Sequence, residues 1–427
     1  MALPLSWTAG FTRAIDNVLH DSDVVDDVLH SRARQCLEVL DTSSHHDVEL
    51  FNGLEWAKRI HQAAPRRPVF TAKKLFNAMY RIADELSLVA GKRYVSAAIC
   101  TCAGHVANAG GTSEEQAALL AEVLGQLSTI WAAFILWPFY ARGHIRPTEP
   151  AYHSQSGDST PTARHVEANR STEQHRRWTQ QIMARDNYWC PIWGSFDDDL
   201  YDLPAIPPNA LSTILTTVPI IQPVVLTQDM HGDTVEHEIA AHALKHYFGV
   251  DDAIYEKLDS PQNGFAMSVA SRTAFRRFMF SLRPTEKPNC YEFRDERPGL
   301  RFAGCQHVSD HITFVDHSAT SPLVQQAAAM LGHSMPEGAV DLPSRDLLRL
   351  HATLAGVLRL SGAAGVFDGV RVPPSGSPPA LPPPGGAAFW RSVVEYDGPA
   401  VCLEAELRDS LALARFRDSE RVSVSGC

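Results

Sequence analysis

The chain has few cysteines, and no two of them are spaced as a CxxC pair. Eight cysteines in 427 residues are too sparse for a disulfide scaffold. The missing CxxC pair also removes the sequence signature of a zinc ribbon or a thioredoxin-like redox site. We therefore expect reduced thiols.

The sequence also lacks a long hydrophobic run. Residues 1–13 contain no basic region followed by a long apolar stretch, so they do not resemble a signal peptide. The most apolar stretch, residues 130–140, is well short of the roughly 20 residues that a helix needs to span a bilayer. These absences predict a soluble, cytoplasmic protein with no membrane partner.

Positive charge is not in excess either. The chain has 38 lysines and arginines against 49 aspartates and glutamates, a formal charge of −11. This balance argues against a nucleic-acid partner, because nucleic-acid affinity depends mainly on cations that neutralise phosphates. No Walker loop, dinucleotide fingerprint or serine nucleophile elbow is present, so we expect no cofactor. We expect the acidic run at residues 197–199 to be an exposed loop.

The sequence pattern predicts an α+β fold with a helical N-terminal region. In residues 70–90, apolar side chains recur at spacings of three and four, which is typical of one helix face. Further along, residues 371–388 hold seven of the 28 prolines. We assign residues 1–143 to the helical N-terminal region, 144–170 to a linker, 171–370 to a second domain, 371–388 to a Pro-rich segment, and 389–427 to a C-terminal strand and helix.

Six stretches together resemble, in order and spacing, the HNH-nuclease-like proteins that are common in filamentous fungi and mushrooms. They are residues 136–143, 185–197, 258–265, 278–285, 312–318 and 342–367. The resemblance covers most of residues 50–370 and implies that the second domain is a ββα-metal unit elaborated with helices. In that family, the unit holds one divalent metal against a scissile phosphate. One histidine acts as general base, an asparagine orients it, and a second histidine on the helix ligates the metal.

Matched to that pattern, the chain keeps the asparagine and loses both histidines. Asn263 takes the place of the central asparagine, whereas Arg272 stands where the metal ligand should be. A guanidinium stays protonated and offers no lone pair to a metal. Arg276 replaces the aspartate that follows, and Pro219, which cannot transfer a proton, occupies the position of the base. The resemblance therefore implies a degenerate site without a metal, in which nuclease chemistry is lost.

A second alignment places the base at His242, and it lacks the metal ligand as well. His242 and His246 are four residues apart, so on a helix they could share a metal. His237 and His242 are five residues apart and diverge by roughly 140° around a helix. We expect a solvated or core-edge histidine pair here, and no metal.

From sequence we favour a repurposed HNH-fold enzyme of fungal secondary metabolism. A lost metal site leaves a concave surface, and abundant aromatic side chains suit an apolar terpenoid or polyketide substrate. The reaction that we expect is a cofactor-free pericyclic cyclisation, such as an intramolecular Diels-Alder [4+2] addition, in which the protein folds the substrate and polarises it. The expected catalytic residues are Arg272, Arg276, Asn263 and His242, and the expected substrate-binding residues are Trp193, Tyr188, Trp189, Tyr247 and Phe275.

Two other functions stay open. One is a metal-dependent HNH endonuclease that uses His242, Asn263 and a metal ligand that the motif does not identify. The other is a non-catalytic pseudonuclease that binds a partner through the same surface. The sequence leaves the oligomeric state open.

Overall fold

A computed structural model describes residues 10–21, 23–42, 70–144, 163–229, 235–296 and 309–367. The predicted Pro-rich segment (371–388) and C-terminal extension (389–427) lie outside the described residues, as does most of the predicted linker. Helix α9 begins at Ala163, inside the range that we assigned to that linker. The described chain is α+β, with long helices and small sheets.

The N-terminal region is helical, as predicted. Its helices are α1 (Gly10–His20), α2 (Asp26–Leu37), α3 (Val39–Thr42), α5 (Ala72–Glu85), α6 (Val89–Asn108) and α7 (Ser113–Trp131). Helix α5 buries Leu75, Met79 and Ile82, which are three of the residues whose spacing predicted it. Thr112 caps α7 in a capping box with Glu115, so each side chain satisfies an otherwise free backbone N–H group.

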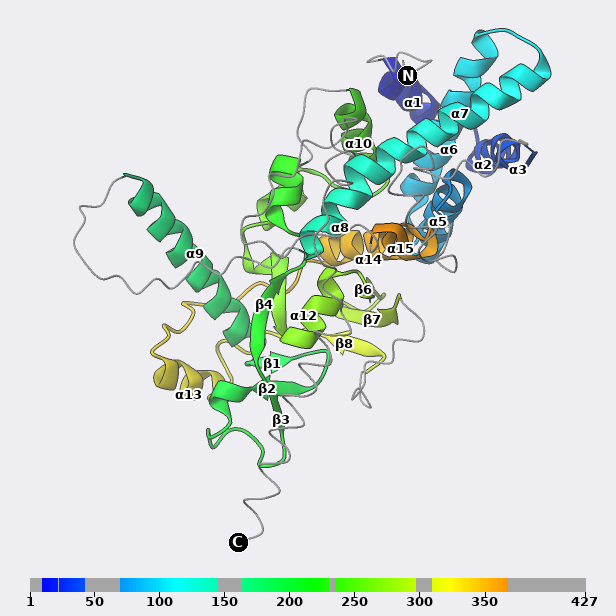
Figure 1. Cartoon of the computed structure of the whole chain (residues 1–427). Coiled ribbons are helices and arrows are strands. Elements are labelled where there is room, and N and C mark those ends of the chain that lie inside the picture. The colour runs from blue at the N-terminus through cyan, green and yellow to red at the C-terminus, as the bar shows by residue number, and fades with distance from the viewer. Residues whose placement is uncertain are drawn as a thin grey trace.

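Helix α7 continues into a π-helical turn, η1 (Ala132–Leu136), and then into α8 (Trp137–His144). Pro138 explains this irregularity, because proline has no N–H group and its ring clashes with the carbonyl four residues earlier. The Trp137 amide bonds instead to the Ala132 carbonyl, five residues back. The resulting long rod runs from the N-terminal helices to the middle of the molecule (Figure 1).

The second half of the chain forms three small sheets surrounded by helices. The strands are β1 (Trp189–Cys190), β2 (Ser195–Asp197), β3 (Leu211–Thr213), β4 (Leu215–Pro219), β5 (Gly264–Ser268), β6 (Phe280–Pro284), β7 (Cys290–Asp295) and β8 (His311–Thr313). The helices are α9 (Ala163–Arg185), η2 (Asp198–Leu200), η3 (Val225–Asp229), α10 (Val235–His246), α11 (Asp252–Lys257), η4 (Pro261–Asn263), α12 (Val269–Arg276), α13 (Pro322–Leu331), α14 (Arg345–Leu360) and α15 (Ala363–Phe367).

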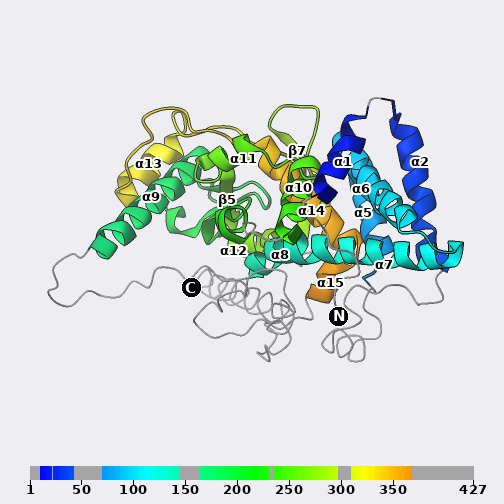
Figure 2. The same cartoon turned by 90° about the horizontal axis from the view of Figure 1, so that it is seen from above.

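One hydrophobic core joins the two predicted regions. Helix α14 packs against α5 of the N-terminal region and against β6 of the second, and α10 packs against α1, α6 and α7. Figure 2 shows α14 and α10 between the N-terminal helices and the sheets. The elements that carry the candidate site are therefore fixed to the N-terminal helices by shared packing.

A buried ion pair fastens the second half of the chain. Arg185 and Asp186 are both buried, and the guanidinium also donates to the Pro261, Gly264 and Asp341 carbonyls at 2.7–2.8 Å. Asp186 in turn accepts a hydrogen bond from the Ala266 amide at 2.7 Å. A buried ion pair is tolerated only when hydrogen bonds satisfy both partners, as they do here. The pair ties the end of α9 to β5 and to the segment before α14.

Candidate functional site

The candidate site is formed by the antiparallel strand pair β4–β5 and by α12, the helix that follows β5. Strands β4 and β5 pair antiparallel, with Pro219 opposite Gly264 and Leu215 opposite Ser268. Ser268 caps α12 by accepting a hydrogen bond from the Ser271 amide, so the helix begins directly after the strand. Two strands followed by a helix is the order that the sequence resemblance implied for this stretch.

Asn263 stabilises the loop at one end of this strand pair through side-chain hydrogen bonds. Its side-chain oxygen accepts from the Ile221 amide at 3.0 Å, and its side-chain nitrogen donates to the Ile221 and Leu258 carbonyls at 2.9 Å each. The side chain is fully buried, and both of its amide hydrogens are used in these bonds. Gly264 follows because a Cβ atom there would lie 2.6 Å from the Trp178 ring. The Asn263 side chain therefore links the backbone at Ile221 to the backbone at Leu258.

Arg272 and Arg276 lie on one face of α12, four residues apart. Both are half-buried; Arg272 donates to the Thr216 hydroxyl on β4 at 3.3 Å, and Arg276 donates to the Arg142 carbonyl on α8 at 3.0 Å. Burial lowers the pKa of Arg276 to about 10, and the positive charges of Arg272 and Arg277 lower it further. We call Arg272 and Arg276 the arginine face of α12. Two cations held close together in a partly buried setting favour an anionic or strongly accepting oxygen.

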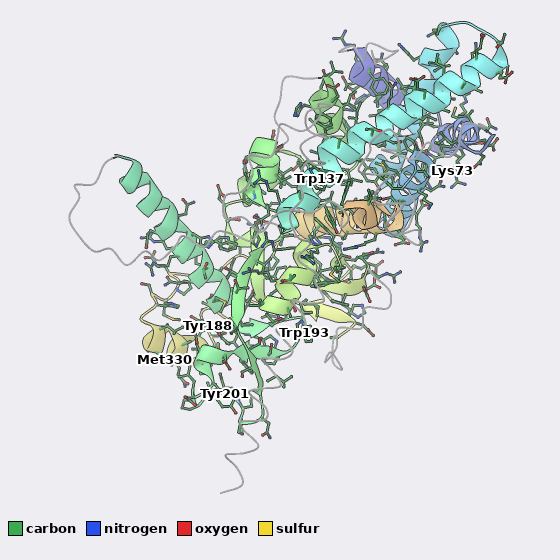
Figure 3. The ribbon with its side chains drawn as sticks, in the orientation of Figure 1. Lys73, Trp137, Tyr188, Trp193, Tyr201 and Met330 are labelled. Atoms are coloured by element: carbon green, nitrogen blue, oxygen red, sulfur yellow. The ribbon has the colours of Figure 1, made fainter. Side chains whose placement is uncertain are left out.

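The turn that carries Trp193 lies beside the start of α12. Burial raises the pKa of the Cys190 thiol on β1, and nearby backbone groups and the Ser271 hydroxyl of α12 partly oppose that shift. Gly194 closes the turn with a left-handed backbone (φ 63°) and bonds to the Cys190 carbonyl. Trp193, labelled in Figure 3, is half-buried in this turn. The turn that carries Trp193 therefore starts near Ser271, in the first turn of α12.

The other predicted substrate-binding residues are divided among separate places. Trp189 stacks edge-to-face on Phe196 within the small β1–β2 sheet. Tyr188 is buried at the end of α9 and contacts the His333 ring nitrogen at 3.3 Å. Tyr247 follows α10 and donates to the Met79 carbonyl of α5 at 2.8 Å. These three side chains are held by packing or hydrogen bonds of their own.

Phe275 is a core residue on α12. Its ring is inaccessible to solvent and stacks on His351 of α14, with ring centroids 3.8 Å apart, and edge-to-face on Phe265 of β5. The ring is buried in the interior, whereas Arg272 and Arg276 are half-buried. Phe275 therefore packs α12 against α14 and β5.

His242 belongs to a different cluster from the arginine face. It lies on α10, where its Nε2 atom is 3.0 Å from a carboxylate oxygen of Asp16 on α1, and His246 Nε2 is 3.9 Å from the same oxygen. Burial lowers the pKa of His246, and the neighbouring His242 lowers it further. Asp16 was missed from the sequence because it lies 226 residues from His242. Thr12, Asp16 and His20 at spacings of four were the only local signal.

The acidic run at residues 197–199 forms the start of the short helix η2. Burial raises the pKa of Asp197 to about 6, and the adjacent Asp199 and Asp198 add to the effect. Within the part of the chain that the structure describes, these carboxylates do not belong to a group arranged to hold a metal. Only Asp199 of the three is exposed, so the loop is less open than the sequence suggested.

Comparisons with known proteins add little to this geometry. No protein-family model matches the chain, and no solved structure matches it. A stretch of 117 residues is 34% identical to the E3 ubiquitin-protein ligase bre1 of Aspergillus oryzae. The match spans 27% of this chain and only 14% of that protein, so it does not show a shared family.

One described helical stretch, Ser113–Arg142, is long and apolar enough to cross a membrane. Its most apolar window is 78% buried inside the protein, because α7 and α8 pack into the core. Trp131 and Phe134 in this stretch are almost inaccessible to solvent. This burial fits the core helix of a soluble protein, which passes the same test of length and composition.

Proposed function

We propose that the arginine face of α12 binds the polar end of an apolar small molecule and that the protein catalyses its cofactor-free cyclisation. The reaction class is a pericyclic ring closure, such as an intramolecular [4+2] addition. Arg272 and Arg276 would donate hydrogen bonds to a carbonyl or carboxylate oxygen of the electron-poor partner. The apolar remainder of the substrate would lie along Trp193.

The pairing of Arg272 with Arg276 carries this proposal. Two half-buried guanidiniums one helical turn apart can both donate hydrogen bonds to one accepting oxygen. Fixed donors in a partly dry site stabilise developing negative charge without reorganising during the reaction. Ser268 caps the N-terminus of α12, and Phe275 packs the helix against His351 of α14. Both contacts fix the position of a helix whose donors must stay in place.

Conversion of a linear polyene with a conjugated carbonyl group, followed by chromatography of its products, tests this function. We expect the full chain to raise the cyclisation rate and to bias the stereochemical ratio of the products. Replacing one donor, Arg272→Gln or Arg276→Gln, should lower the rate by about 10²–10³-fold, the usual effect of losing one oxyanion donor. Arg177→Gln, on the 74% exposed Arg177 of α9, is the matched control and should leave the rate unchanged.

A non-catalytic binding protein is the second candidate, because the same two guanidiniums would also bind a phosphate or carboxylate. Binding of the polyene that depends on Arg272 and Arg276, with unchanged rate and stereochemistry, would replace the enzyme by this alternative. An endonuclease that uses His242 and Asn263 together is disfavoured by their positions. His242 contacts Asp16, whereas the Asn263 amide hydrogens bond to the Ile221 and Leu258 carbonyls.

A further inference from the structure

Helices α1 and α10 face one another through side chains at spacings of four. Thr12 on α1 donates a hydrogen bond to Glu238 on α10. One turn further along both helices, Asp16 meets His242, and His246 follows after another turn of α10. Spacings of four place these side chains on the same face of each helix.

We propose that Asp16, His242 and His246 form a Zn²⁺ site that fastens α1 to α10. Two imidazole nitrogens and one carboxylate oxygen are a donor set that zinc accepts, with a water molecule completing the tetrahedron. This function is separate from the arginine face, because the site lies between two other helices. It also differs from a hydrolytic HExxH site, since Ala243 follows His242 where that motif has its glutamate base.

The distances between the ligand atoms fit one ion. Zinc binds nitrogen and oxygen at about 2.0–2.1 Å, so tetrahedral ligand atoms should be about 3.3–3.4 Å apart. The Asp16 oxygen lies 3.0 Å from His242 Nε2 and 3.9 Å from His246 Nε2, which brackets that separation. All three ligand atoms lie within 4.8 Å of one another. Changes in the side-chain torsion angles would bring the ligand atoms to the tetrahedral separation.

Packing restricts the two imidazoles, and the Asp16 side of the site is open to solvent. The Tyr94 ring on α6 stacks on His246, with ring centroids 5.9 Å apart and planes within 12°, and it lies 5.5 Å from His242. The His242 and His246 side chains are 12% and 25% exposed, whereas Asp16 is 41% exposed. The nitrogen ligands are therefore positioned by packing, and the carboxylate side faces solvent.

Metal analysis of the full chain, expressed without a histidine tag, tests the site. After dialysis against Zn²⁺ and removal of free metal, we expect one equivalent of Zn²⁺ per chain. Replacement with Co²⁺ should give the visible absorption of a four-coordinate ion. Asp16→Asn and His246→Gln, both at partly exposed positions, should each weaken Zn²⁺ binding by on the order of 100-fold or more, since even outer-shell changes weaken metal sites 10–100-fold.

Hydrogen exchange gives a second readout that does not depend on affinity. Zn²⁺ should slow amide exchange in residues 10–20 of the unaltered chain and leave it unchanged in Asp16→Asn. His105→Ala, at an exposed histidine on α6, should bind Zn²⁺ as the unaltered chain does. Absence of stoichiometric Zn²⁺, or equal binding by folded Asp16→Asn and His246→Gln, overturns the proposal. Far-UV circular dichroism establishes that each variant is folded before its binding is compared.

Discussion

His351, on α14, is buried and stacked between two phenylalanine rings. Its ring centroid lies 3.8 Å from that of Phe275 and 4.8 Å from that of Phe278, and its Nε2 atom donates to the Phe275 carbonyl at 3.1 Å. Burial lowers the pKa of His351 from its ordinary value of 6.5 to about 3, and the bond to Phe275 only partly opposes this shift. The folded protein therefore holds this imidazole neutral.

Because the folded pKa is lowered, the unfolded chain binds more protons between about pH 6.5 and pH 3. The stabilisation is fully present above pH 6.5 and is lost as the pH falls, at up to about 1.4 kcal/mol per pH unit. We expect His351→Gln, which keeps a donor but does not titrate, to show a shallower fall in unfolding free energy over this range. Denaturant melts at a series of pH values measure it, with the exposed His311→Gln as control. Equal slopes for His351→Gln and the unaltered chain would show that the burial of His351 does not govern acid stability.

At the scale of elements, α14 packs closely on α5 where Gly356 lies against Ile82. A Cβ atom at that position would collide with the end of the Ile82 side chain, including its Cγ1 atom at 2.8 Å. Ile82 is fully buried and has no free space to move into. Glycine is retained within this helix because the neighbouring helix requires the room, although alanine has the better helix propensity by about 1 kcal/mol.

We predict that Gly356→Ala lowers the free energy of unfolding by about 1–3 kcal/mol, the usual range for an overpacked core. Adding Ile82→Val removes the Cδ1 atom that the new methyl group would meet. The double variant should therefore be more stable than Gly356→Ala alone, although Ile82→Val by itself is destabilising. Chemical denaturation of the four proteins measures the coupling. Strictly additive changes would contradict this packing of α14 on α5.

The sequence was most informative about elements with local signals. The apolar spacing in residues 70–90 predicted α5, and the capping box of Thr112 and Glu115 at the start of α7 is likewise a local pattern. Strands are harder to predict, as residues 190–194 illustrate. Only Trp189–Cys190 is a strand there, and a turn that uses the left-handed backbone of Gly194 follows it. Such short strands are set by tertiary pairing, which a local pattern does not encode.

The candidate site was predicted in part. The order of β4, β5 and α12 is the one that the resemblance implied, and the shared face of Arg272 and Arg276 follows from their spacing of four. The separation of His242 from them, and its meeting with Asp16, depend on how α1 packs against α10. The spacing of Thr12, Asp16 and His20 marks one face of α1, but it does not indicate that this face meets residues 226 positions away.

At the scale of the whole molecule, one core spans both regions that the sequence divided into domains. Helix α14 contacts α5 on one side and β6 on the other, and its residues Leu347 to Leu358 are almost all buried. Arg283 on β6 also bridges Glu85 of α5 at 2.6 Å and Glu296 at 3.0 Å. Opening either side would expose α14, so the two regions should unfold together.

We predict that native-state hydrogen exchange finds the same opening free energy for the slowest amides of α5, α14 and β6. Increasing denaturant should merge all three in one global unfolding reaction. Helix α2, which packs against α6 at the edge of the N-terminal helices, provides the internal comparison and should open at a lower free energy. If α5 opened with α2 while β6 and α14 stayed protected, the N-terminal helices would be a separate folding unit. The shared core would then not couple the helical region to the sheets, and the original boundary near residue 143 would describe the energetics after all.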